Sequence, residues 1–184
     1  MVCGVIQFRG GNAMAAWGAV FATAWMGCGE APVAAAEAQG PIVCVEYVGK
    51  WSDKPILPLV ITSAKPSRER LKMLLGDSSK PDHAEVFLFS EAEVRGLADQ
   101  VARQLERLAA AATSGIVRIT VAGVALTGQA PGEPTDASKI SRVIPTESAR
   151  KILDRFDHFE PADTAAGKDL KEAVATFRHR TYLN

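Results

Sequence analysis

The chain has 184 residues, of which 47% are hydrophobic and 23% are charged. These values are typical of a globular protein with one well-buried core. Lysine plus arginine and aspartate plus glutamate both number 21, which excludes the strong overall positive charge with which proteins attract nucleic acid or an anionic membrane. We therefore expect no nucleic-acid partner. Without residues 1–38 the chain keeps 20 basic and 19 acidic residues, so the balance does not depend on the N-terminus.

The N-terminal segment 1–38 has the pattern of an export signal followed by a tether. Arg9 is the one basic residue before a run of sixteen uncharged residues at 13–28. This run is shorter than the roughly 20 residues that span a bilayer, so it predicts a cleaved signal rather than a permanent anchor. Small residues two apart at 34–36 and 36–38 predict cleavage near residue 36 or 38. The alternative is a buried alanine-rich helix. The absence of a polar stripe in the segment argues against this alternative.

A second cleavage position is suggested by Cys28. Residues 25–28, Trp-Met-Gly-Cys, resemble the lipobox of bacterial lipoproteins, in which a cysteine after a small residue becomes the acylated N-terminus. The resemblance covers four residues and implies lipidation at Cys28, the only membrane attachment that we expect. Residues 29–41 then have the composition of a flexible tether. The exported protein is therefore either soluble or lipidated. In both cases a single globular α/β domain, residues 39–184, is expected in the periplasm, at the outer envelope or outside a bacterial cell.

The first part of this domain predicts a hairpin, a short helix and a third strand. A β-branched run at 42–48 and an apolar run at 56–62 are separated by turn residues, which favours a hairpin. Because Pro58 cannot donate a hydrogen bond to a neighbouring strand, it predicts that the second strand lies at a sheet edge or contains a bulge. A short helix is expected at 66–75, followed by a strand at 85–89.

The strongest local pattern is the helix predicted over 90–112. Ser90 and Glu93 have the spacing of a capping box, and Gly115 lies where a left-handed C-cap would fall. The apolar residues recur at three- and four-residue steps and form one stripe. These residues are Val94, Leu97, Ala98, Val101, Leu105, Leu108, Ala109 and Ala112.

The remaining elements complete an α/β or α+β domain. Alternating residues at 116–126 and a short run at 139–144 predict two further strands, and helices are expected at 146–159 and 164–182. The long helix joins two strands and implies a crossover. We therefore predict a mixed sheet of four to five strands with an N-terminal hairpin, one long central helix and two C-terminal helices. The loop at 127–137 contains no large apolar residue.

No pattern in the chain predicts a resident cofactor or metal. Motifs of serine hydrolases, zinc proteases, nucleotide-binding loops and redox dithiols do not occur. His83, His158 and His179 are too far apart in sequence for a local metal motif. The single thiol expected to remain in the domain, Cys44, lies inside a predicted strand, where a packed thiol is expected.

One stretch supports a weak catalytic hypothesis. In the 77–83 loop, His83 would act as a general base beside Asp82, with Ser78 or Ser79 as the nucleophile. The alternative is a solvated loop histidine, because an adjacent aspartate cannot readily orient the imidazole of its own neighbour. On this hypothesis the protein would be a small hydrolase.

The sequence favours a non-catalytic binding or structural role over catalysis. Trp51 lies in the predicted hairpin turn, so we expect a partner to dock at the sheet edge near Trp51 and Pro58, or else at the 127–137 loop. Basic residues at 65–72 and 178–180 would form an anion-binding patch if the two segments meet, and are otherwise solvated. The expected partner is an envelope protein or a small ligand.

Overall fold

The computed structural model describes residues 40–50, 55–76, 80–108, 115–127 and 138–183. The predicted export signal and tether at 1–38, including Cys28, lie outside these residues, as does the predicted domain boundary. Trp51, Ser78 and Ser79 also lie outside them, and of the 127–137 loop only Thr127 is described.

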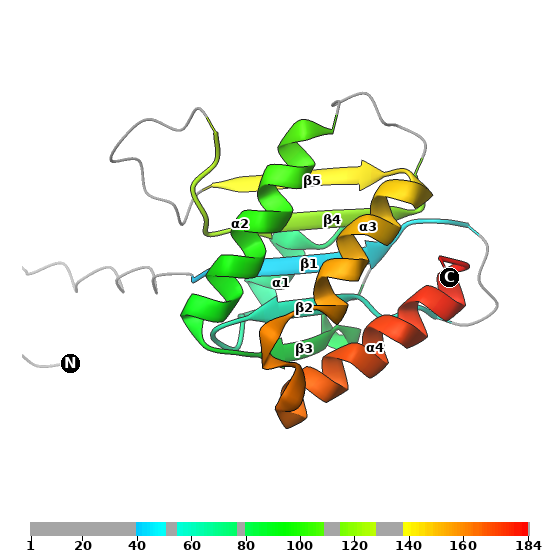
Figure 1. Cartoon of the computed structure of the whole chain (residues 1–184). Helices are drawn as coiled ribbons and strands as arrows, with labels where there is room; N and C mark the ends of the chain where they lie inside the picture. Colours follow the sequence, from blue (N-terminus) through cyan, green and yellow to red (C-terminus); the bar gives the residue numbers. More distant parts are fainter. Residues whose placement is uncertain (1–39, 51–54, 77–79, 109–114, 128–137, 184) are drawn as a thin grey trace, which may run out of the picture. The chain divides into compact units, whose positions relative to one another are not determined.

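Five strands form one mixed sheet in the order β3-β2-β1-β4-β5 (Figure 1). The strands are β1 (Ile42–Tyr47), β2 (Leu59–Thr62), β3 (Glu85–Leu88), β4 (Val117–Ala122) and β5 (Lys139–Ile144). β2 and β3 are parallel, whereas β1 pairs antiparallel with both β2 and β4, and β4 pairs antiparallel with β5. The predicted mixed sheet with an N-terminal hairpin is therefore confirmed.

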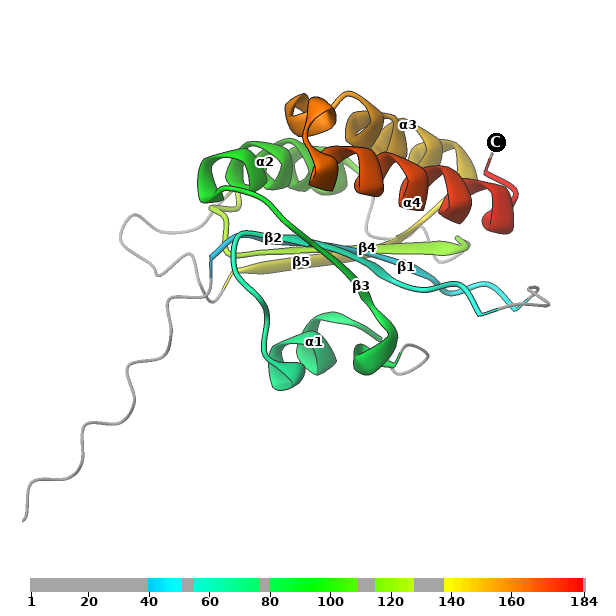
Figure 2. The same ribbon diagram turned by 90° about the horizontal axis from the view of Figure 1, so that it is seen from below.

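Helices cover both faces of this sheet (Figure 2). The long helix α2 (Glu91–Arg107) lies on one face together with α3 (Thr146–Asp157) and α4 (Ala165–Thr181), and the short helix α1 (Arg68–Leu74) lies on the other. Short 3-10 helices precede β3 and α4 at Pro81–His83 and Glu160–Asp163. The predicted central helix and two C-terminal helices are thus present. None of the described helices has both the length and the apolar surface needed to span a membrane.

The core is divided between the two faces because successive strand residues point to opposite sides of a sheet. Val43 and Val45 of β1 belong to the core under α2, α3 and α4. Cys44 belongs to a smaller core under α1. Its thiol is fully buried, and burial raises the pKa of Cys44 to about 12. The prediction of a packed thiol is confirmed.

Helix α2 begins where the sequence predicts and ends earlier. The Ser90 backbone N–H donates to Glu93 Oε2 at 2.8 Å, and the Glu93 N–H donates to Ser90 Oγ, so the capping box is confirmed. The helix ends at Arg107, however, and not near residue 112. The alanines that follow offer only methyl groups for burial, which stabilise little. Gly115 is not the C-cap of this helix, because the C-cap is Leu108. Gly115 instead packs closely against β5, where a Cβ would collide with the backbone of Ile144.

The edge position predicted from Pro58 is wrong. β2 lies between β1 and β3, and the edges of the sheet are β3 and β5. Pro58 directly precedes the first paired residue, Leu59, so its missing N–H falls outside the ladder, while its carbonyl accepts the Glu85 N–H at 2.9 Å. Pro58 is also buried, so it offers no surface to a partner.

Candidate anion-binding site

Of the 77–83 loop, the structure describes Lys80 and the 3-10 helix Pro81–His83 that follows it. Asp82 and His83 are both exposed. The carboxylate of Asp82 accepts a hydrogen bond from Arg68 Nη2 at 2.7 Å, so it is paired with α1. The catalytic serine that the hydrolase hypothesis needs falls on Ser78 or Ser79, outside the described residues.

The two basic segments at 65–72 and 178–180 do not meet, so the condition for a joint anion-binding patch is not fulfilled. The first lies on and before α1 and the second at the end of α4, on opposite sides of the sheet (Figure 2). Several of their arginines have partners within the fold. Arg70 is buried and donates to the Gly40 carbonyl at 2.6 Å, and Arg178 forms ion pairs with Asp154 and Asp157.

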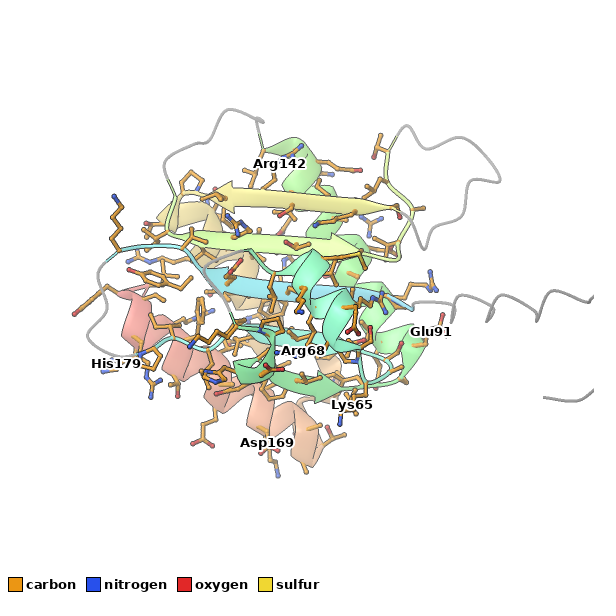
Figure 3. The ribbon with its side chains drawn as sticks, turned by 180° about the vertical axis from the view of Figure 1, so that it is seen from behind. Lys65, Arg68, Glu91, Arg142, Asp169 and His179 are labelled. Atoms are coloured by element: carbon orange, nitrogen blue, oxygen red, sulfur yellow. The ribbon has the colours of Figure 1, made fainter. Side chains whose placement is uncertain are left out.

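A different group of arginines surrounds one hollow on the face of the sheet that α2, α3 and α4 cover. Arg103 and Arg107 come from the last turns of α2, and Arg142 comes from the edge strand β5 (Figure 3). We call this site the arginine hollow. It has a volume of about 530 Å³, and its lining is completed by Glu106, Thr127 and Ile140.

The backbone explains how these three side chains come to line one hollow. Arg103 and Arg107 are four residues apart and therefore adjacent on the surface of α2. On β5 the alternation of the strand points Arg142 to the same face as Ile140 and Ile144, which belong to the core. Arg142 thus occupies a position that an apolar residue would normally fill, beneath the end of α2.

Arg142 is half-buried and incompletely hydrogen-bonded. Its Nη1 donates to the Ser141 carbonyl at 3.1 Å. Its Nε is buried and has no hydrogen-bond partner among the described residues. A buried donor without a partner is destabilising, so this group departs from the usual pattern of folded proteins.

Glu106 is the one carboxylate of the hollow, and it is already engaged. Its two oxygens accept the Thr127 N–H and the Thr127 hydroxyl, each at 2.6 Å. The side-chain and backbone hydrogen bonds from Thr127, with a further contribution from the Arg103 charge, hold the pKa of Glu106 below its ordinary value. Glu106 therefore stays ionised at neutral pH and ties the chain after β4 to α2.

The arginine hollow has an excess of positive charge. It contains three guanidinium groups against one carboxylate, and the C-terminal end of α2 contributes roughly half a negative charge, which leaves about +1.5. None of the three arginines forms an ion pair with another described residue. Because guanidinium groups bind carboxylate and phosphate oxygens in bidentate geometry, the hollow can bind an anion.

A second polar hollow, between the first turns of α2 and the end of α3, has no such excess. Its volume is about 510 Å³, and its charged side chains are Glu93 and Arg155, with His158 beside them. The opposite charges cancel, and Glu93 is held by the capping box with Ser90. This hollow is therefore the weaker candidate for binding an anion.

The sequence held a signal for the arginine hollow, namely an arginine between two isoleucines at the core-facing positions of a strand. Arg142 becomes informative only once the side of β5 that faces the helices is known. Among the described residues, no three histidine, cysteine, aspartate or glutamate side chains come together as metal ligands would. No family model, no curated protein and no solved structure matches the chain.

Proposed function

We propose that the protein is an exported domain of the bacterial envelope with a non-catalytic binding role, and that the arginine hollow binds an anionic group of its ligand. The observation that supports the binding site is the set of three arginines around one hollow that contains a single carboxylate, Glu106, among the described residues. Like charges held close together repel each other, so an anion between them stabilises the folded protein.

The lining of the arginine hollow favours binding over catalysis. Its cationic groups are arginines, which stay protonated at all ordinary pH values and therefore do not act as general acids or bases. Glu106 and Thr127 are hydrogen-bonded to each other. A phosphate or carboxylate group held by charge-assisted hydrogen bonds fits these residue types.

Export is supported by the uncharged run at 13–28 and by the small residues that follow it. Mass spectrometry of the N-terminus of the protein recovered from its bacterial host tests this part of the proposal. An acylated Cys28 or a first residue near Glu37 or Gln39 supports export and also separates the lipidated from the soluble form. An intact Met1 in a cytosolic protein contradicts it.

Binding is tested with inorganic phosphate as the probe, titrated into the purified protein at low ionic strength and followed by NMR chemical shifts. We expect saturation with a Kd below about 10 mM and shifts centred on the end of α2 and on β5. Replacing Arg142 with glutamine should weaken binding by at least about tenfold, because it removes one charge-assisted contact.

The matched control is Arg95→Gln. Arg95 also lies on α2, so the variant changes the net charge by the same amount, but its partner is the exposed Glu91 and it does not line the hollow. Its Kd for phosphate should stay within about twofold of that of the parent protein. Equal weakening by the two variants, or a linear titration that never saturates, would mean that the hollow is not a binding site.

A further inference from the structure

We propose that the anion bound in the arginine hollow carries a short apolar chain, and that this chain lies in a second hollow on α2. This inference depends on the proposed function and adds the chemical class of the ligand. The ligand is then an amphipathic anion rather than a simple inorganic ion. Three observations lead to this assignment: a neighbouring apolar hollow, an arginine shared between the two hollows, and a buried acceptor without a partner.

The second hollow lies between the end of α2 and the start of α3, and we call it the apolar hollow. It has a volume of about 210 Å³, and its surface is almost entirely apolar. Leu108 and Ile152 supply branched aliphatic groups, and the stems of longer side chains complete the wall. A hydrocarbon chain of the ligand placed here is removed from water, which favours binding.

Arg107 lines both hollows, so the two hollows are adjacent on the surface of α2. Lys151, which also lines the apolar hollow, is about 70% exposed and pairs only loosely with the equally exposed Glu147 at 3.2 Å. Two of the residues that line the apolar hollow, Arg107 and Lys151, therefore carry cationic groups. A chain that ends in an anionic group matches this arrangement, whereas an uncharged chain would form no ion pair with the cationic groups.

Gln104 supplies the third observation. Gln104 is one of the residues that line the apolar hollow, and its Oε1 is buried and has no hydrogen-bond partner among the described residues. Buried acceptors in folded proteins nearly always have a donor. A hydroxyl or amide N–H on the ligand chain would satisfy this oxygen, so the ligand chain is expected to carry one donor.

The size of the apolar hollow limits the chain. Pockets that enclose a whole small-molecule ligand usually have about 300–1,000 Å³, so 210 Å³ accommodates one short branch of a ligand and not a long lipid tail. A chain of about six carbon atoms is a suitable probe.

The test compares three probes: inorganic phosphate, methyl phosphate and n-hexyl phosphate, all well below the concentration at which micelles form. We expect n-hexyl phosphate to bind at least about tenfold more tightly than methyl phosphate, because only the longer chain reaches the apolar hollow. Its titration should also shift the resonances of residues on α3 that line this hollow.

Two variants separate the contributions of the two hollows. Ser148, on α3, lines the apolar hollow and not the arginine hollow. Ser148→Phe introduces a large side chain there without removing a core residue, so it should abolish the advantage of the hexyl chain and leave the phosphate Kd unchanged. If this variant does not fold, Gln104→Met is used instead. It keeps the chain length, removes the buried acceptor, and should remove any preference for 2-hydroxyhexyl phosphate over n-hexyl phosphate.

The outcomes distinguish this inference from the proposed function. If phosphate binding depends on Arg142 but methyl and hexyl phosphates bind equally, the apolar chain is wrong and the anion site stands. If no phosphate probe binds in an Arg142-dependent way, the proposed anion site is contradicted, and the inference that depends on it is contradicted as well. Binding to phosphatidylglycerol vesicles without binding to monomeric n-hexyl phosphate would also overturn the inference, since the ligand would then be a membrane surface.

Discussion

Arginines on the two faces of the sheet have opposite surroundings. On the face covered by α1, Arg118 donates from Nη1 to Glu46 Oε2 at 3.0 Å, and the two residues lie directly opposite each other on β4 and β1. On the other face, Arg142 has a buried Nε without a partner among the described residues, and Arg103 and Arg107 lie nearby. The first arginine neutralises a charge of the fold, whereas the three arginines of the hollow share one carboxylate, Glu106, among the described residues.

The difference indicates which arginines stabilise the fold. Glu46 is only 2% exposed, and a carboxylate so deeply buried requires partners. Arg118 and the backbone N–H of Gly76, at 3.1 Å from Glu46 Oε2, are two of them. Arg142 forms no ion pair with a buried carboxylate among the described residues, so on the proposed function its place at a core-facing position serves the ligand.

The largest expected effect is that of Arg118→Met. This variant leaves Glu46 buried without its cation, so we expect the free energy of unfolding to fall by about 2–4 kcal/mol, measured by urea denaturation at neutral pH. The affinity for phosphate should not change, because Arg118 lies on the face of the sheet away from the arginine hollow.

The control for Arg118→Met is the double variant Glu46→Met with Arg118→Met. Removing both charges removes the uncompensated carboxylate, so the double variant should be more stable than Arg118→Met alone. A single variant as stable as the parent protein would show that Glu46 does not need Arg118, and the contrast between the two faces would lose its basis.

Most of the fold could be predicted because it follows from local periodicity. The stripe predicted for α2 includes Val94, Val101 and Leu105, which are all buried in the core. The interior position of β2 in the sheet could not be predicted from its own residues, because it depends on β3 pairing with β2 after the chain has passed through α1. Pro58 was misinterpreted for that reason.

The candidate site was far less predictable than the fold. The pair of Glu46 and Arg118 spans 72 residues of sequence, and nothing in either strand alone indicates it. The arginine hollow likewise requires that β5 lie beneath the end of α2. The binding residues suggested by the sequence came from turn chemistry and exposed aromatic character, which do not detect charges that the fold brings together.

A smaller effect of opposite sign is expected for Arg142→Leu. Leucine suits the core-facing position between Ile140 and Ile144, and it removes a buried donor and one of three like charges. We therefore expect the free energy of unfolding to rise by about 1 kcal/mol, again measured in urea, while phosphate binding is lost. Stability gained at the expense of binding is typical of functional residues.

The interpretation of Arg142→Leu depends on a surface control and on added ligand. Arg95→Leu removes the same charge from an exposed helix position and should change stability by less than about 0.5 kcal/mol. Phosphate at concentrations above its Kd should stabilise the parent protein and not Arg142→Leu, because only a folded protein with an intact site gains from the ligand. If Arg142→Leu is instead strongly destabilised, Arg142 serves the fold as Arg118 does, and the two faces of the sheet no longer differ in the way that supports a ligand.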